Sequence, residues 1–136
     1  MGQMTRVVHG DTTYAILIES FGGQAPGFFT PRETALQAGI VDHPAGYYSP
    51  PHAHSCERRE IGETCEFLYV DSGRIAVEIF DEAWRSLRAV TLAAGDCAVL
   101  IRGGHSVRAL EPTRLVEVKQ GPYPGDGKAK VFRDAQ

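Results

Sequence analysis

Short runs rich in β-branched and aromatic residues, each bounded by glycine, proline or aspartate, most constrain what this 136-residue chain can fold into. No stretch shows a long apolar repeat with the period of a helix. The runs instead have the length of single strands. They predict strands at residues 12–19, 36–42, 66–71, 74–81, 87–92, 97–102, 106–110 and 114–120. We therefore expect an all-β protein, built as a barrel or a sandwich.

The connections between these runs carry turn signals of their own. Asp71-Ser72-Gly73 predicts a tight hairpin, because glycine adopts the positive φ that such turns need. Residues 81–86 predict a second hairpin, residues 22–27 a loop, and residues 121–128 a segment with enough glycine and proline to leave the barrel. We expect one domain over 1–136, with N-terminal strands in 1–45, a barrel core in 46–120 and a C-terminal tail in 121–136.

Charge and hydropathy exclude two classes of partner. The net charge is -3 and the pI is about 5.9, so the chain lacks the positive field that collects nucleic-acid phosphates. The longest apolar runs, at residues 14–18 and 97–101, are too short to cross a bilayer, and the N-terminus does not read as a secretion signal. We expect no nucleic-acid partner, no membrane partner and a cytoplasmic location.

The three cysteines are Cys56, Cys65 and Cys97, and their spacing forms no paired CxxC motif and no even framework. They are predicted to be reduced thiols, as is usual in a reducing compartment. A bridge between Cys56 and Cys65 stays open but nothing in the spacing supports it. A free cysteine is most often a small buried hydrophobic residue.

His52 and His54 are the strongest chemical signal in the sequence. In an extended strand this spacing would put both imidazoles on one face, about 6 to 7 Å apart along the backbone. Imidazole nitrogen suits Zn, Mn, Fe, Ni and Cu, whereas Mg and Ca prefer oxygen ligands. A closed barrel could bring Glu66 and His105 to the same point, because Glu66 opens one predicted strand and His105 directly precedes another. Three imidazoles and a carboxylate leave two octahedral positions for water or substrate.

The same residues resemble the two motifs of the cupin superfamily. Gly46 precedes His52-Ala53-His54 at the spacing of the first motif, and Glu66 stands seven positions before Gly73. The gap between the histidines and Glu66 is longer than in the family, which implies an enlarged loop at residues 55–65.

The enlarged loop also contains rival carboxylates at Glu57, Glu60 and Glu63. Glu57 follows the histidine pair closely enough to compete as the metal ligand. We prefer Glu66, because it alone keeps the family's distance to the Gly73 turn. The charged run itself is more typical of a solvated loop than of a substrate-binding segment.

The second cupin motif has an approximate counterpart in this chain, which Gly95-Asp96 and Gly103-Gly104-His105 resemble. Ile101 or Arg102 stands where the family has proline, and Ala109 stands where it has asparagine.

The resemblance implies a single-domain cupin, which is a double-stranded β-helix or jelly-roll barrel. It implies one divalent transition-metal ion (Zn, Mn, Fe, Ni or Cu) near one mouth of the barrel, and a homodimer. The ligands that it implies are His52, His54, Glu66 and His105. Residues 116–123 also look like the ending of small uncharacterised cupins associated with surface-polysaccharide genes.

Glu117 and Lys119 alternate with Val116 and Val118, so one of these pairs must face the interior of a regular strand. The cost of burying charge favours the charged pair outside. If it points inward, Lys119 could act as a general acid or hold a substrate carboxylate, with Glu117 as its partner. Arg102 could hold an anionic group at the mouth.

Two classes of function fit this pattern. The first is a metal-dependent enzyme that isomerises, epimerises or oxygenates a small polar molecule, such as a carbohydrate-like compound or a carboxylate. The second is a non-catalytic module that binds or senses a metal or small ligand. Because cupin folds host both, the fold cannot choose between them. A metal-free barrel is a third interpretation, which requires the histidines to be clustered by accident.

Overall fold

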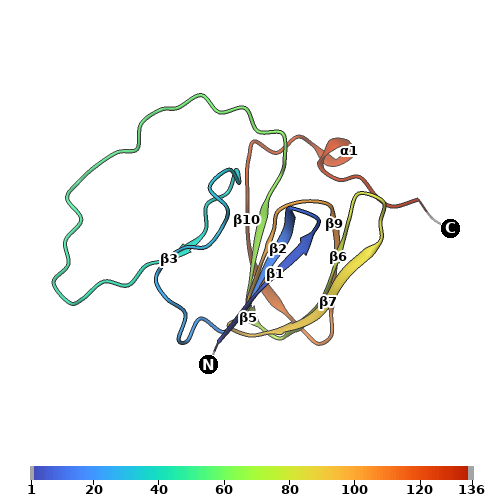
Figure 1. Ribbon diagram of the computed structural model, residues 1–136, viewed down its shortest axis with the longest axis horizontal. Helices are drawn as coiled ribbons and strands as arrows, with labels where there is room; N and C mark the ends of the chain where they lie inside the picture. The colour runs from blue at the N-terminus through green and yellow to red at the C-terminus, as the bar shows by residue number, and fades with distance from the viewer. Residues whose placement is uncertain (1, 135–136) are drawn as a thin grey trace.

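The computed structural model describes residues 2–134, and its strands form two facing antiparallel sheets (Figure 1). The larger sheet has the order β1 (Gln3–His9), β2 (Thr12–Glu19), β8 (Cys97–Leu100), β5 (Glu66–Ser72) and β10 (Arg114–Lys119). The smaller sheet has the order β7 (Ser86–Ala93), β6 (Arg74–Phe80) and β9 (Gly104–Ala109). A two-stranded pair, β3 (Gly27–Phe28) and β4 (Gly39–Ile40), and a short helix α1 (Asp126–Ala129) complete the described elements.

The expectation of an all-β fold is confirmed, and most predicted strands lie within two residues of their observed bounds. The strand predicted at 36–42 is limited to β4, while β1, β3 and α1 were not predicted. In β1 only one residue, Val7, is buried, so its sequence lacks the strong alternation that identifies a strand. Among residues 2–134, no helix is long and apolar enough to cross a membrane.

The main hydrophobic core lies between the two sheets. Its side chains come from both, including Leu68 and Val70 of β5 and Ile75, Val77 and Ile79 of β6. A second cluster covers the opposite face of the larger sheet, where residues 21–40 pack on it. Strands β2 and β8 are therefore buried on both faces, which explains why each is a continuous apolar run.

The two sheets are open along one side. Strands β9 and β10 are edge strands of their sheets and do not pair with each other, so no closed barrel forms within residues 2–134. Val107 of β9 lies opposite Val77 of the core and still has 40% of its surface exposed. The structure is an open sandwich, and the expectation of a closed barrel is not met in the described chain.

The predicted hairpin at Asp71-Ser72-Gly73 is wrong. Strand β5 pairs with β8 and β10, whereas β6 pairs with β7 and β9, so the chain crosses from one sheet to the other at this turn. Gly73 has a φ of 85°, and a Cβ there would collide with the backbone of Pro112. Val70 and Ile75 can thereby face the same core from opposite sheets.

The second predicted hairpin is confirmed, because β6 and β7 pair antiparallel around residues 81–86. Asp81 holds the turn together through hydrogen bonds, and only 3% of its surface is exposed. Its carboxylate accepts hydrogen bonds from Ala83 N at 2.9 Å, Arg85 N at 3.0 Å and Arg85 Nε at 2.8 Å. These donors replace the water that burial removes.

We predict a pH-dependent contribution of Asp81 to stability. The backbone hydrogen bond from Arg85 is the largest cause holding the pKa of the Asp81 carboxyl below its ordinary value, against the opposing effect of burial. Because the pKa of Asp81 is lower in the folded state, its carboxylate stabilises the fold at pH values above the unfolded pKa of about 3.9. This stabilisation is lost as the pH falls through the folded-state pKa. Urea unfolding should therefore find Asp81→Asn less stable than wild type at pH 7, with a smaller difference at pH 3.

The exposed Asp71→Asn substitution is the matched control, and it should change stability little at either pH. A difference between Asp81→Asn and wild type that is the same at pH 7 and pH 3 would contradict this account of the turn.

Candidate functional site

Glu66 and His105 meet at the open end of the sandwich. Glu66 begins β5 on the face that also carries Leu68, and His105 lies opposite Ile79 in the pairing of β9 with β6. Both side chains therefore point toward the core between the sheets. His105 Nε2 lies 3.3 Å from Glu66 Oε2, and the two side chains are 33% and 16% exposed. We call this end, defined by Glu66, His105 and Lys119, the mouth.

The surroundings of Glu66 favour its ionised form. The hydrogen bond with His105 is the largest cause that lowers the pKa of the Glu66 carboxyl, and burial opposes it. The charges of His105, Lys119 and Lys130 lower this pKa further. A carboxylate oxygen and an imidazole nitrogen thus lie side by side at the mouth, although their strands belong to different sheets.

Glu117 and Lys119 face the core side of the larger sheet, contrary to our expectation. Lys119 lies opposite Glu66 and Glu117 opposite Leu68 in the antiparallel register, and directly opposite residues share a face. The cost of burying charge did not decide the orientation, because edge strand β10 leaves Lys119 and Glu117 41% and 44% exposed. Their Nζ and Oε1 atoms are 3.5 Å apart.

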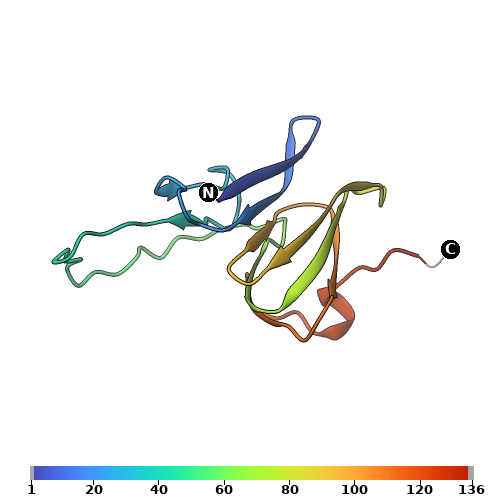
Figure 2. The ribbon, with the colours of Figure 1, turned by 90° about the horizontal axis from the view of Figure 1, so that it is seen from below.

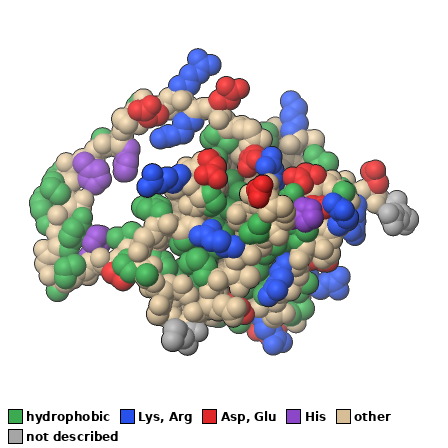
Figure 3. All heavy atoms as spheres, viewed as in Figure 1, with side chains coloured by type: hydrophobic (Ala, Val, Ile, Leu, Met, Phe, Trp, Pro, Cys, Tyr) green, Lys and Arg blue, Asp and Glu red, His purple; other side chains and the backbone are tan. Residues whose placement is uncertain are grey.

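His52 and His54 lie on a long projecting segment, residues 41–65, which we call the arm. The arm contains neither helix nor strand and reaches away from the sheets in both ribbon views (Figures 1 and 2). The two imidazole rings are exposed, with centroids 5.5 Å apart. Histidine side chains gather on this arm in the space-filling view (Figure 3).

His52 and His54 lie in no strand, so the condition under which their spacing would put both imidazoles on one face of a strand is not met. Pro50 and Pro51 precede them and lack the N–H groups that strand pairing needs. Within residues 2–134, no group of three or more His, Cys, Asp or Glu side chains is arranged to hold a metal ion. The structure therefore brings together two of the four predicted ligands, Glu66 and His105, and leaves His52 and His54 apart from them.

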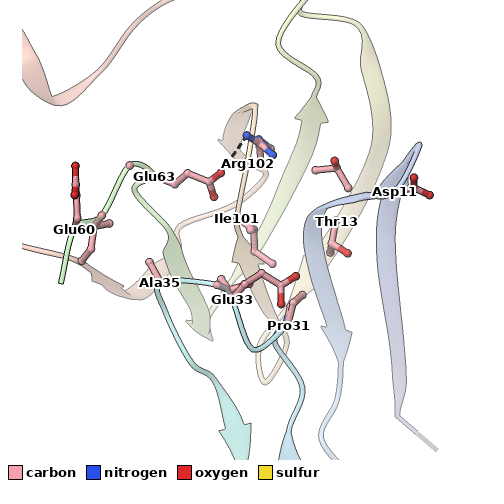
Figure 4. Close-up of a pocket in the computed structure, with 13 residues that line it drawn as sticks. Asp11, Thr13, Pro31, Glu33, Ala35, Glu60, Glu63, Ile101 and Arg102 are labelled. Carbon is pink, nitrogen blue, oxygen red and sulfur yellow. Dashed lines mark ion pairs between the residues drawn. The ribbon is translucent and has the colours of Figure 1, made fainter. Parts of the chain in front are cut away.

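The rival carboxylates lie elsewhere. Glu57 is exposed on the arm and accepts a hydrogen bond from Ser55 Oγ at 3.4 Å. Glu60 and Glu63 line a 390 Å³ cavity between the end of the arm, the β1–β2 turn and residues 31–35 (Figure 4). Of these carboxylates and Glu66, only Glu66 forms an ion pair with a histidine in the described part of the chain.

Arg102 anchors the end of the arm. Its guanidinium lies 3.3 Å from Glu63 Oε1 and 3.3 Å from Glu82 Oε1, and the first pair is drawn in Figure 4. Tyr14 donates its hydroxyl hydrogen to Glu82 at 2.5 Å, which connects this network to β2. Arg102 therefore links the end of the arm to the turn between β6 and β7. Its role in holding an anionic group stays a prediction.

The C-terminal tail is exposed, with Val131 and Phe132 86% and 78% exposed, yet one of its cations contacts the smaller sheet. The Arg133 guanidinium lies 5.3 Å from the centre of the Phe80 ring, a cation–π contact. Lys130 is near enough to Glu66 to lower its pKa. Local sequence patterns cannot predict this contact, because it joins a tail cation to an aromatic side chain far away in the chain.

We predict that one thiol per chain reacts with Ellman's reagent in the native protein. Cys56 is exposed on the arm, whereas Cys65 and Cys97 have no exposed surface. Burial is the main cause that raises the pKa of the Cys97 thiol to about 12, so its thiolate is scarce at pH 8. Cys56→Ser should abolish the native reaction, and all three thiols should react in denaturant. Reaction of a buried thiol at the Cys56 rate would contradict the packing.

No family model matches the chain, and neither a curated protein nor a solved structure matches it. The cupin resemblance and the ligand set that it implies therefore remain predictions.

Proposed function

We propose that this protein binds one divalent transition-metal ion at the mouth and acts there on a small polar molecule. The observation that carries the proposal is the 3.3 Å approach of Glu66 and His105 from two different sheets. Their carboxylate oxygen and imidazole nitrogen are ligand types that Zn, Mn, Fe, Ni and Cu accept. The cupin interpretation of the two facing antiparallel sheets is part of this proposal.

His52 and His54 complete the ligand set when the arm folds onto the mouth. The twelve positions from His54 to Glu66 span about 40 Å when extended, so the chain is long enough. The end of the arm is already held beside the mouth, by the Glu63–Arg102 pair and by the bond from Cys65 N to Gln120 Oε1 at 2.8 Å. The rest of the arm is exposed, so little packing opposes its movement.

The side chains around the pair favour catalysis over storage. A bound ion would polarise a carbonyl or hydroxyl group of the substrate. Lys119 stands opposite Glu66 and can donate a proton to a bound molecule, while Glu117 orients it through their 3.5 Å contact. Both are more than one-third exposed, so a substrate entering from solvent can reach them. A site that only stores metal needs no such groups.

Metal content of the untagged protein tests the proposal. After loading with Zn, Mn, Fe, Ni or Cu and removal of excess metal, the wild type should hold about one ion per chain by elemental analysis. Glu66→Gln, His105→Ala and the double variant His52→Ala/His54→Ala should each weaken binding by roughly 100-fold or more, since loss of a mere supporting residue costs about 10- to 100-fold.

His43→Ala is the matched control, because His43 lies on the same arm but outside the proposed ligand set. It should bind metal like the wild type, and circular dichroism should show that every variant is folded. A wild-type protein that holds no metal after loading would overturn the proposal. Metal binding that survives in His52→Ala/His54→Ala would remove the arm from the site.

A further inference from the structure

A second cavity, of 490 Å³, lies next to the mouth. Its walls are the end of the arm, residues 61–64, the end of β10 with the chain that follows, residues 119–124, and helix α1. Its size is in the range of sites for small molecules. Lys119 lines this cavity and also stands opposite Glu66, so the cavity adjoins the Glu66–His105 pair. We call it the lysine cavity.

The lysine cavity concentrates positive charge on an acidic chain. The chain has only three lysines, Lys119, Lys128 and Lys130, although its net charge is -3. Lys119 and Lys128 line the cavity, and Lys130 acts on the neighbouring Glu66. Among the described residues, the charged side chains of its lining are Lys119, Lys128 and Glu63, and Glu63 lies 3.3 Å from Arg102. Lys119 lies 3.5 Å from Glu117, so Lys128 carries the net positive charge of this lining. The cavity is therefore suited to an anion.

Gln120 adds a hydrogen-bond donor to the same lining. Its Oε1 accepts the bond from Cys65 N, which fixes the orientation of the side-chain amide. Its Nε2 is buried and has no hydrogen-bond partner among the residues that the structure describes. A buried donor without an acceptor costs free energy, so an acceptor supplied by a ligand would be favourable.

We propose that the lysine cavity binds a small organic carboxylate. The carboxylate accepts hydrogen bonds from Lys119 and Gln120, and Lys128 adds a second positive charge. The apolar remainder of the molecule lies against Ile61 and Pro122, which also line the cavity. The described residues of the cavity lining include no arginine, whose guanidinium fork is the group best matched to phosphate. The lysine cavity binds the carboxylate without a metal. If the proposed metal site at the mouth is also correct, small organic carboxylates are the substrate class of that site.

Calorimetric titration of chelator-treated protein with acetate, succinate and citrate, at constant ionic strength, tests the inference. At least one of them should bind saturably, with one site per chain, and more tightly than inorganic phosphate. Lys119→Met should weaken this binding about tenfold or more, because it removes a charged hydrogen bond. Lys119→Arg should retain most of it. Arg88→Met, an exposed cation on β7, is the control and should bind like the wild type.

The side-chain amide signals of Gln120 in the ¹⁵N spectrum locate the site, and they should shift with the same dissociation constant. Absence of saturable binding for all three carboxylates, equal binding by folded Lys119→Met, or tighter binding of phosphate would each overturn the inference. Because the protein is free of metal in this experiment, failure here leaves the metal proposal standing, and failure of the metal loading leaves this one standing.

Discussion

The contact between Glu66 and His105 depends on a constraint that governs the whole structure: β9 and β10 are edge strands of the two sheets and do not pair with each other. A closed barrel would bury this side, and charged residues there would be costly. The open side instead lets Lys119 and Glu117 sit on the core side of β10 while remaining in contact with water. The deeper Glu66, at 16% exposed, is the one that requires a partner, and His105 supplies it.

Local sequence patterns predicted the strands well, because the burial of a strand determines which of its own residues are apolar. Strand β2 was predicted with the bounds that it has, since both of its faces are covered and its apolar run is continuous. The choice of which strands pair cannot be seen in the residues of one strand. The turn at Gly73 looks like a hairpin in the sequence, yet it joins two sheets, because the choice of partners for β5 and β6 is made by residues far along the chain.

The candidate site could also be predicted only in part. Glu66 and His105 were expected to be neighbours, and they are, since Glu66 begins β5 and His105 is the second residue of β9 at the same end of the sandwich. The position of the histidine pair could not be predicted, because the spacing of His52 and His54 does not show whether their segment joins a sheet, and here it lies outside the sheets after Pro50 and Pro51. The two ion pairs of Arg102 were not predicted, because both of its carboxylate partners are distant in sequence.

The central claim is that Glu66 and His105 are the fixed half of a metal site that the arm completes. A crystal structure of the manganese- or zinc-loaded protein, with an anomalous difference map, tests it most directly. The account predicts one strong peak about 2.0 to 2.2 Å from the Glu66 carboxylate and the His105 imidazole, with His52 and His54 drawn onto the same ion. A peak at another place, or a loaded crystal in which Glu66 and His105 remain in direct contact without an ion, would contradict it.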